Sequence, residues 1–314
     1  MSELIPVRVT RVSSETADIR LIELSPIGGD ALPTWDPGAH IDVHLPGLVR
    51  QYSLIGLQGG TTYQIGVLRD LQSRGGSRYL HEDLQTGDVL RIGRPRNNFP
   101  LTNGMAPAIL IGGGIGITPL LVMAERLRRE ESNWHLHYCV RSRDRLAFVD
   151  AMAAFGDRVT FHVDEEAGGP PDLARFINEA PSGAHFYCCG PTVMLTAFAA
   201  ATASLSAERV HTERFAAVAP EGDSCTEEFD LVLSRSGRTL RVPQHQSILE
   251  TLEANGIESP WSCRLGVCGE CRTTVLEGTC DHRDSVLSDA ERSSQEVILI
   301  CCSRARTPQL VIEL

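Results

Sequence analysis

The sequence predicts a multidomain α/β plus β protein: an antiparallel β-barrel, then a doubly wound parallel α/β domain, then a small C-terminal domain. Three observations predict this fold class. The first third of the chain forms short β-type runs, the middle third alternates strands with helices, and the last third carries four unevenly spaced cysteines. The 314 residues are enough for two or three separate hydrophobic cores. We place the domains at residues 1–103, 104–225 and 226–314.

The barrel is predicted from six short β-type runs broken by turns. They are Arg8–Val12, Ile19–Leu24, His40–Leu45, Gln51–Leu54, Tyr63–Val67 and Val89–Ile92. Strands of this length at this spacing are typical of a small antiparallel barrel. One helix is expected over Ser77–Leu84, with Ser77 as its N-cap and Gly87 closing the turn after it.

The middle domain is predicted from strand and helix alternation. The expected strands are Ala108–Ile111, Leu136–Val140, Val159–Val163, His185–Cys188 and Arg209–His211. A helix follows the first strand over Pro119–Glu130, with Thr118 as its N-cap. This alternation indicates a parallel sheet of the doubly wound type.

The C-terminal domain follows a polar stretch, residues 216–228, that we interpret as an exposed linker. It opens with a hairpin of two strands, Phe229–Leu233 and Thr239–Val242. A short helix over Ile248–Asn255 is expected next, with Ser247 as its N-cap and Gly256 as its terminator.

Composition excludes several classes of function. The formal net charge of -11 disfavours nucleic-acid binding, which needs clustered cations. The chain contains no lysine, so Schiff-base chemistry is excluded. No apolar run approaches the roughly 20 residues of a membrane helix, and we expect a cytoplasmic protein without membrane contact. Ten cysteines in such a protein indicate metal binding in place of disulfides.

Four cysteines have the spacing C-x4-C-x2-C, 29 residues, then C: Cys263, Cys268, Cys271 and Cys301. This is the plant-type [2Fe–2S] pattern, in which four thiolates hold two irons. Gly266 and Gly269 let the loop curl so that its backbone N–H groups point at sulfur. A structural zinc site is the alternative, although zinc sites usually have paired C-x2–4-C knuckles. Cys302 is a minor alternative as the fourth ligand.

A glycine-rich turn, GGGIGITP, lies between the first strand of the middle domain and its helix. Backbone amides at such a turn can hold a pyrophosphate. A second turn, CGP, closes the fourth strand at the same carboxyl edge, where open α/β sheets bind ligands. The two turns predict a dinucleotide crevice lined by Gly113, Gly114, Gly116, Thr118, Cys189, Gly190 and Pro191.

The residues expected to read the nucleotide ribose follow the second and third strands. Arg141, Ser142 and Arg143 can face a 2′-phosphate, which would mean NADPH. Asp164 and Glu165 disfavour that extra negative charge, so we expect NADH. A solvated turn is the simpler interpretation of the two arginines.

A flavin site is suggested by the tetrapeptide RQYS on a barrel strand. Alternation along the strand places Arg50 and Tyr52 on one face and turns Ser53 the other way. An arginine can pair with a phosphate, and a tyrosine ring can stack on a flavin. The turn Gly75–Gly76–Ser77 offers a second phosphate contact.

The order RQYS, GGS, GGGIGITP, CGP and the cysteine pattern resembles the phthalate dioxygenase reductase family, which includes vanillate demethylase reductases. The resemblance covers essentially the whole chain. It implies FMN on the barrel, NADH on the middle domain and a [2Fe–2S] cluster in a C-terminal β-grasp ferredoxin domain. It also implies that the electron acceptor is the Rieske centre of a terminal oxygenase.

The resemblance assigns roles to individual residues. The residues that it implies for the flavin are Arg50, Tyr52, Ser53, Val67, Leu68, Arg69, Gly76 and Ser77. Thr118 and Cys189 would flank the nicotinamide, and Phe215 resembles the aromatic residue that shields the flavin. Ser53, Thr118, Cys189 and Phe215 are therefore the candidate catalytic residues.

Such a protein would take a hydride from NADH and pass single electrons to a partner. Hydride transfer requires no side-chain acid or base at the reacting carbon, so we expect catalysis by stacking of the two rings. The cluster loop 263–271 is the expected docking surface, with Arg264 steering the acceptor. Two alternatives remain: a reductase for a haem or diiron acceptor, and a non-catalytic electron-transfer subunit or redox sensor.

Overall fold

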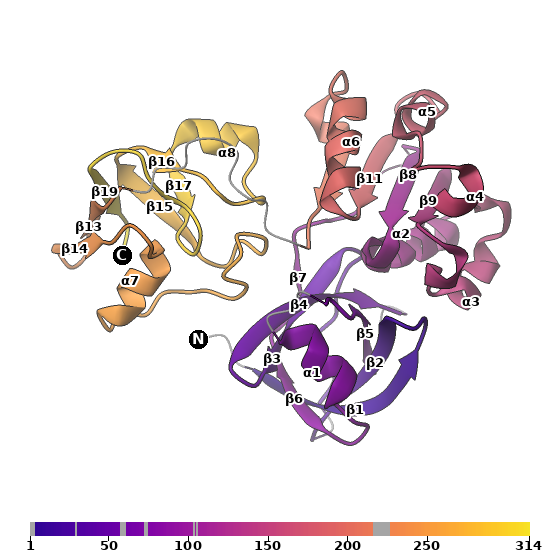
Figure 1. The fold of residues 1–314 in the computed structure, drawn as a ribbon, viewed down its shortest axis with the longest axis horizontal. Coiled ribbons are helices and arrows are strands. Elements are labelled where there is room, and N and C mark those ends of the chain that lie inside the picture. The colour runs from indigo at the N-terminus through magenta and orange to yellow at the C-terminus, as the bar shows by residue number, and fades with distance from the viewer. Residues whose placement is uncertain are drawn as a thin grey trace. The chain divides into compact units, whose positions relative to one another are not determined.

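The structure is a computed structural model that describes residues 4–28, 30–56, 61–71, 75–102, 104, 106–215 and 227–314. It divides into two compact units, and the division falls between Arg214 and Phe215. The first unit holds the barrel and the parallel sheet, and the second holds the C-terminal domain (Figure 1). The predicted boundaries at residues 103 and 225 stay predictions. Both residues, and residues 216–226 of the predicted linker, lie outside the described residues.

The barrel is a closed antiparallel ring with the strand order β4-β5-β2-β1-β6-β3, and β3 pairs back onto β4. Apolar side chains such as Ile41 and Val43 point into its core. Helix α1 packs on the barrel and adds Leu80 to that core (Figure 1). The elements are β1 (Ile5–Ser14), β2 (Ile19–Pro26), β3 (Ala39–Leu45), β4 (Leu48–Ile55), β5 (Tyr63–Leu68), α1 (Gly76–Glu82), β6 (Val89–Ile92) and β7 (Arg96–Asn97).

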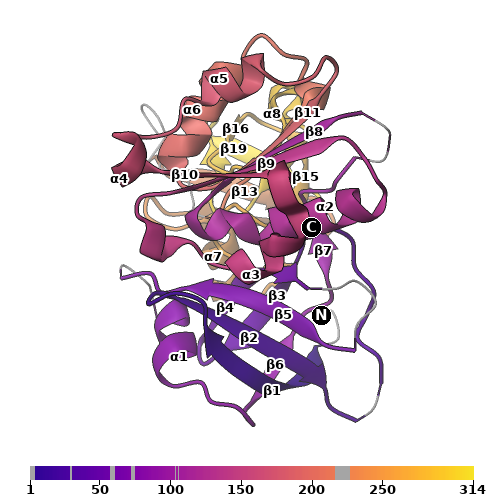
Figure 2. The same cartoon turned by 90° about the vertical axis from the view of Figure 1, so that its right-hand side faces the viewer.

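The second half of this unit is a parallel sheet with the order β10-β9-β8-β11-β12. Helices α5 and α6 cover one face, and α2 and α3 cover the other (Figure 2). The elements are β8 (Ala108–Gly113), η1 (Gly114–Gly116), α2 (Ile117–Arg129), β9 (Trp134–Val140), η2 (Arg143–Arg145), α3 (Val149–Met152), η3 (Ala153–Arg158), β10 (Val159–Val163), α4 (Asp164–Ala167), α5 (Leu173–Asn178), β11 (His185–Cys189), α6 (Thr192–Thr202), η4 (Ala207–Arg209) and β12 (Val210–Glu213).

The second unit has a mixed sheet with the order β14-β13-β19-β15-β17, in which β13 and β19 run parallel and the other pairs antiparallel. Helix α7 packs on this sheet, which confirms the β-grasp arrangement. The elements are β13 (Phe229–Leu233), β14 (Arg238–Val242), α7 (Ile248–Ala254), β15 (Arg272–Glu277), β16 (Cys280–Asp281), α8 (Asp289–Ser294), β17 (Val297–Leu299), β18 (Arg304–Ala305) and β19 (Gln309–Ile312).

Helix caps were predicted with mixed success. Ser247 caps α7, as the sequence predicts. It also forms a reciprocal capping box with Glu250. The other two N-cap predictions are wrong. Thr118 lies inside α2, because η1 starts the helical turn three residues earlier and the Thr118 hydroxyl donates to the Ile115 carbonyl. Ser77 also lies inside its helix, and its hydroxyl accepts from the Asp70 amide.

Among the helices that the structure describes, none combines the length and the apolar character that a bilayer crossing requires. Among the described helices α2 is the longest, with 13 residues, and its last turn carries Arg126, Arg128 and Arg129.

Candidate functional site

The two glycine turns of the parallel sheet meet at its carboxyl edge. Strands β8 and β11 are parallel neighbours, and their register places Cys189 opposite Gly112. The chain leaves β8 toward β9 on one side, and β11 and β12 lie on the other side. This reversal of strand order is the position where doubly wound sheets bind nucleotides.

Two of the three predicted pyrophosphate glycines are required by packing. A Cβ atom on Gly116 would lie 2.2 Å from the Cys189 carbonyl oxygen and 2.7 Å from the Gly190 amide nitrogen. A Cβ atom on Gly113 would lie 2.7 Å from the Met194 sulfur and 2.8 Å from a carbon of Pro191. Glycine at both positions therefore lets the two turns touch.

Gly114 differs from these two glycines. Its φ is +54°, and within the described residues nothing lies within 4 Å of the position that its Cβ would take. A left-handed glycine beside open space allows a ligand to approach the backbone of the turn closely. Gly114 is thus the member of the predicted set that is best placed to approach a pyrophosphate.

Thr118 and Cys189 both lie buried beneath this edge. Thr118 is 2% exposed, and its methyl carbon lies 2.9 Å from the position of a Cβ on Gly66 of β5. Cys189 is fully buried, and burial raises the pKa of its thiol far above the usual range, so the neutral thiol is the stable form. Gly66 therefore allows the barrel to contact the turn that follows β8.

Glu213 is a residue at this edge that the sequence reasoning missed. It ends β12 and lies opposite Cys189 in the register of the two strands. Within the described residues its Oε2 atom has no hydrogen-bond partner, and burial raises the pKa of Glu213 to about 8. Glu213 is half-buried as a residue, but its Oε2 atom is buried, and this burial favours the protonated, uncharged form of the carboxyl group.

Ser53 of β4 carries a second unsatisfied polar atom. Its hydroxyl is buried, with 5% of the residue exposed, and has no partner among the described residues. The β3–β4 register places His40 directly opposite, and the Nε2 atom of His40 is buried without a partner in the same described set. Directly opposite residues share one face of the sheet. Two orphaned polar atoms on one face fit a ligand that can form hydrogen bonds.

The environment of His40 keeps its imidazole neutral. Burial, followed by the nearby Arg96 guanidinium, lowers the pKa of His40 to about 4. Arg96 itself forms two hydrogen bonds to Asp42, at 2.9 and 2.8 Å. A neutral imidazole can donate or accept one hydrogen bond, which suits a polar ring edge. His40 was missed because its role depends on strand register.

The predicted phosphate contacts of the barrel lie together. A Cβ atom on Gly76 would lie 2.8 Å from the Arg50 Cγ atom, so the Arg50 side chain crosses the start of α1. Tyr52 is half-buried and packs against the barrel core, and burial raises the pKa of its hydroxyl. Ser77 is buried, and its hydroxyl is already bound to the Asp70 amide.

The segment VLR on β5 contributes mainly its backbone. The Val67 side chain lies in the barrel core, and its carbonyl lies 2.9 Å from His81 Nε2. Leu68 packs against the core that β8, β9 and α2 share. Arg69 forms an ion pair with Glu82. Its guanidinium, which the resemblance assigned to the flavin, is therefore already bound to a carboxylate.

The predicted ribose-reading residues follow neighbouring strands. Arg141 is exposed just after β9, and its carbonyl accepts from the Glu165 amide at 3.1 Å. Ser142 has extended backbone and precedes η2. Asp164 starts α4 just after β10, and its carboxylate lies 3.3 Å from His162 Nε2. All three positions lie at the carboxyl edge of the sheet.

The four candidate iron ligands form two pairs, and each cysteine is at most 8% exposed. The Cys268 thiol donates a hydrogen bond to the Cys263 sulfur, which raises the pKa of Cys268, and the Cys271 thiol is paired in the same way with Cys301. A [2Fe–2S] cluster needs two thiolates for each of two irons. The pairs Cys263 with Cys268 and Cys271 with Cys301 fit that requirement.

A single zinc ion fits this loop less well. Across the described part of the chain, no three His, Cys, Asp or Glu side chains converge on a point where one metal ion would lie. A zinc site needs four ligands around one point. Two separate thiol pairs agree better with two metal ions.

The cluster loop has the backbone that the sequence predicts. Gly266 and Gly269 have φ values of +71° and +75°. The Leu265 amide donates to the Cys263 sulfur at 3.2 Å. Cys302 packs its sulfur against Gly266, where a Cβ would lie 2.6 Å away, and its sulfur lies 3.7 Å from the Leu299 carbonyl oxygen.

Arg264 is engaged by its neighbours. Its guanidinium carbon lies 3.8 Å from the centre of the Trp261 ring, and it forms an ion pair with Glu253. Glu253 neutralises part of the Arg264 charge. The acceptor-steering role expected for Arg264 stays a prediction.

Comparison with known proteins agrees with this arrangement. Residues 231–306 match the family described as the 2Fe-2S iron-sulfur cluster binding domain. The chain is 43% identical over 312 residues to the phenoxybenzoate dioxygenase subunit beta of Ectopseudomonas oleovorans, covering 99% of this chain and 97% of that one. The solved structure of phthalate dioxygenase reductase superposes with a TM-score of 0.75 at 34% identity, covering 99% and 98% of the two chains. The chain belongs to the phthalate dioxygenase reductase family.

Membership in the phthalate dioxygenase reductase family makes the chain an oxidoreductase and confirms the predicted fold class. The structure of an intact type IV self-sufficient cytochrome P450 monooxygenase is also similar, with a TM-score of 0.89 at 38% identity. That match covers 99% of this chain but 41% of the P450 chain. A segment similar to this chain therefore occurs within a longer cytochrome P450 monooxygenase chain.

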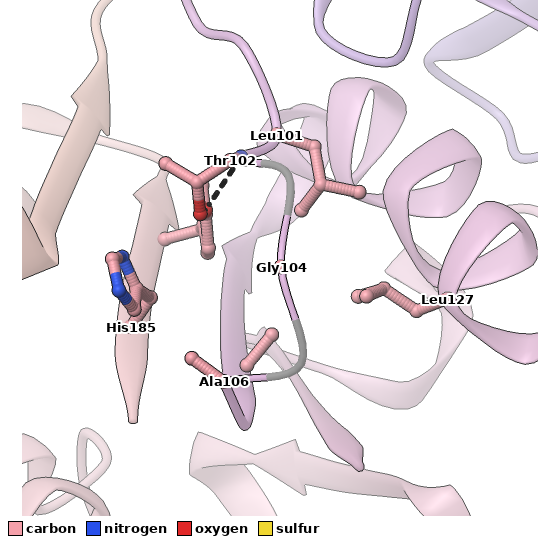
Figure 3. Close-up of a pocket in the computed structure, with 8 residues that line it drawn as sticks. Leu101, Thr102, Gly104, Ala106, Leu127 and His185 are labelled. Carbon is pink, nitrogen blue, oxygen red and sulfur yellow. Dashed lines mark hydrogen bonds between the residues drawn. The ribbon is translucent and has the colours of Figure 1, made fainter. Parts of the chain in front are cut away.

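Two cavities of this family member lie away from the carboxyl edge. One, of about 50 Å³, lies where β8 and β11 begin, beside the Tyr187 hydroxyl that accepts from the Thr102 amide at 3.0 Å (Figure 3). The other, of about 620 Å³, lies beneath α5 and is lined by histidines including His135 and His137. The first is too small for a nucleotide, and neither contains the glycine turns.

Proposed function

We propose that this chain oxidises NADH with the help of FMN and delivers single electrons through a [2Fe–2S] cluster to the Rieske centre of a terminal oxygenase or demethylase. One observation carries the proposal. A single polypeptide combines two glycine turns that meet at the carboxyl edge of a parallel sheet with a loop that holds two buried thiol pairs. A bound flavin would accept the electron pair of one hydride and release it as single electrons, which this combination requires.

The flavin would be held by the barrel. Ser53 offers its unpaired hydroxyl to the ring, Tyr52 offers a stacking surface, and Arg50 with the adjacent Gly76 offers a phosphate contact. The unpaired imidazole nitrogen of His40 offers a second ring contact on the same face as Ser53. FMN is supported by the family and its domain order.

The nucleotide would be held by the carboxyl edge of the parallel sheet. Gly114 allows the pyrophosphate to approach the backbone of the turn closely, and the Gly113 and Gly116 contacts hold the turn in place. Thr118 and Cys189 shape the nicotinamide end as uncharged, buried groups. Phe215, which is 42% exposed, begins the C-terminal unit, and its flavin-covering role is what the family resemblance implies.

The four cysteines would hold the irons, with one pair at each iron. The nine cysteines of the described residues are all free, which agrees with a reducing compartment such as the cytoplasm.

A haem protein is the second candidate acceptor, and the P450 structure favours it. The Rieske oxygenase is preferred because the phenoxybenzoate relative, which this chain covers almost completely, carries the name of a dioxygenase subunit. A redox sensor that binds NADH without turnover is the third candidate.

The purified protein should show flavin and [2Fe–2S] absorption, release FMN on denaturation and be reduced rapidly by NADH. Reduction without electron delivery would favour a sensor, and delivery to a P450 but not to a Rieske oxygenase would favour the haem acceptor. Cys263→Ser should abolish delivery to the protein acceptor and leave NADH oxidation with ferricyanide in place. Full delivery by this variant would refute the proposal.

A further inference from the structure

A bidentate ion pair closes the part of the carboxyl edge where the nucleotide ribose is expected. Arg143 Nε donates to Glu166 Oε1 at 2.7 Å, and its terminal NH2 group donates to Oε2 at 2.6 Å. Arg143 begins η2 directly after β9, and Glu166 lies in α4 directly after β10. The pair thus joins the ends of two neighbouring parallel strands.

The position of the pair relative to the glycine turn makes it relevant to nucleotide choice. In a doubly wound sheet the pyrophosphate lies at the end of the first strand and the adenosine ribose at the end of its neighbour. Here these strands are β8 and β9, which pair in parallel. The ribose 2′ position therefore faces the residues that follow β9, among them Arg143.

The geometry of the pair decides what Arg143 can bind. A 2′-phosphate is recognised by the planar fork of an arginine, which offers two parallel N–H donors. Both donors of one edge of Arg143 are already used by the Glu166 carboxylate. The hydrogen bond from Arg143 also lowers the pKa of Glu166, so the carboxylate stays charged. A 2′-phosphate that approaches Arg143 would find this edge occupied and would meet the negative charge of the Glu166 carboxylate beside it.

We infer that Glu166 is a specificity-determining residue, which selects nucleotides with a free 2′-hydroxyl by occupying the Nε edge of Arg143 and by placing a negative charge beside it. The inference rests on the proposed function, because it concerns the nucleotide that this site oxidises. Both side chains are more than half exposed, at 67% and 51%. A phosphate can therefore reach Arg143 once the carboxylate is removed.

The test compares NADPH with NADH in Glu166→Gln. The ratio of kcat/KM for NADPH to that for NADH, with ferricyanide as acceptor, should rise about tenfold, since one charge-assisted contact becomes available to the phosphate at an exposed position. Glu179→Gln is the matched control, because Glu179 forms a comparable exposed ion pair with Arg175 on α5. It should leave the ratio unchanged.

A double variant separates the arginine fork from a simple loss of charge. In Arg143→Ala/Glu166→Gln the gain for NADPH should disappear. A gain that persists without Arg143, or an unchanged ratio in Glu166→Gln, overturns the inference.

Binding measurements keep this test separate from the proposed function. Calorimetric dissociation constants for adenosine 2′,5′-bisphosphate and for AMP should change in the same ratio in Glu166→Gln. If NADH fails to reduce the wild-type protein, the proposed function fails, while the two binding constants still decide the role of Glu166.

Discussion

Gly116→Ala is the most direct perturbation of the contact between the two glycine turns. The new Cβ would lie 2.2 Å from the Cys189 carbonyl oxygen, which is 0.8 Å inside the 3.0 Å that real Cβ contacts respect. The Cys189 and Gly190 atoms that it meets belong to the backbone, so no side-chain rotation relieves the overlap. One turn must therefore move by nearly 1 Å relative to the other.

The expected cost has two parts. Overpacking of this kind destabilises a protein by roughly 1–3 kcal/mol. A displacement of about 1 Å at the reacting groups costs roughly 100-fold in rate. We expect kcat/KM for NADH with ferricyanide to fall about 100-fold, whereas the [2Fe–2S] absorption stays intact because the cysteines belong to the other unit.

The assay is steady-state NADH oxidation, combined with thermal unfolding of the same samples. Gly169→Ala is the control, because no described atom lies within 4 Å of its Cβ position and its φ is not in the left-handed region. It should match the wild-type protein in both measurements. A Gly116→Ala protein with kcat/KM within twofold of wild type would show that the contact does not position the nucleotide.

Three further predictions follow from single residues. His40→Asn should weaken flavin binding about tenfold, as measured by flavin fluorescence, because one buried hydrogen bond is lost. His44→Asn on the same strand is the control and should leave flavin binding unchanged. Equal effects of the two variants would contradict the role of His40. Glu213→Gln should remove a pH dependence of stability. The folded-state pKa of about 8 exceeds the ordinary 4.5, so the free energy of unfolding of the wild type should fall as pH rises from 4.5 to 8. Denaturant titrations at pH 5.5 and 8.5 that show the same fall in the variant would refute this prediction. Cys301→Ser should lose the [2Fe–2S] spectrum and delivery to the protein acceptor, while Cys302→Ser should keep both, and the reverse result would exchange their roles.

Much of the fold could be predicted because its signals are local in the chain. Runs such as Val159–Val163 and Phe229–Leu233 match the observed strands residue for residue, since the period of a strand is visible within a few residues. The α2 cap could not be predicted in this way. The 3-10 turn that precedes α2 makes the Thr118 hydroxyl bind the Ile115 carbonyl and not a free amide.

The sequence by itself determined the kinds of chemistry, because the C-x4-C-x2-C run, the two glycine turns and the RQYS strand are each contiguous and their donor groups can be recognised without a fold. Only the tertiary structure decided which groups meet. The contact of Gly116 with Cys189, the position of His40 opposite Ser53, and that of Glu213 beside Cys189 depend on how strands pair. The pairing of Cys271 with Cys301 depends on a loop that closes across 29 residues. Such contacts follow from register and burial, which are properties of the packed chain and not of any short segment.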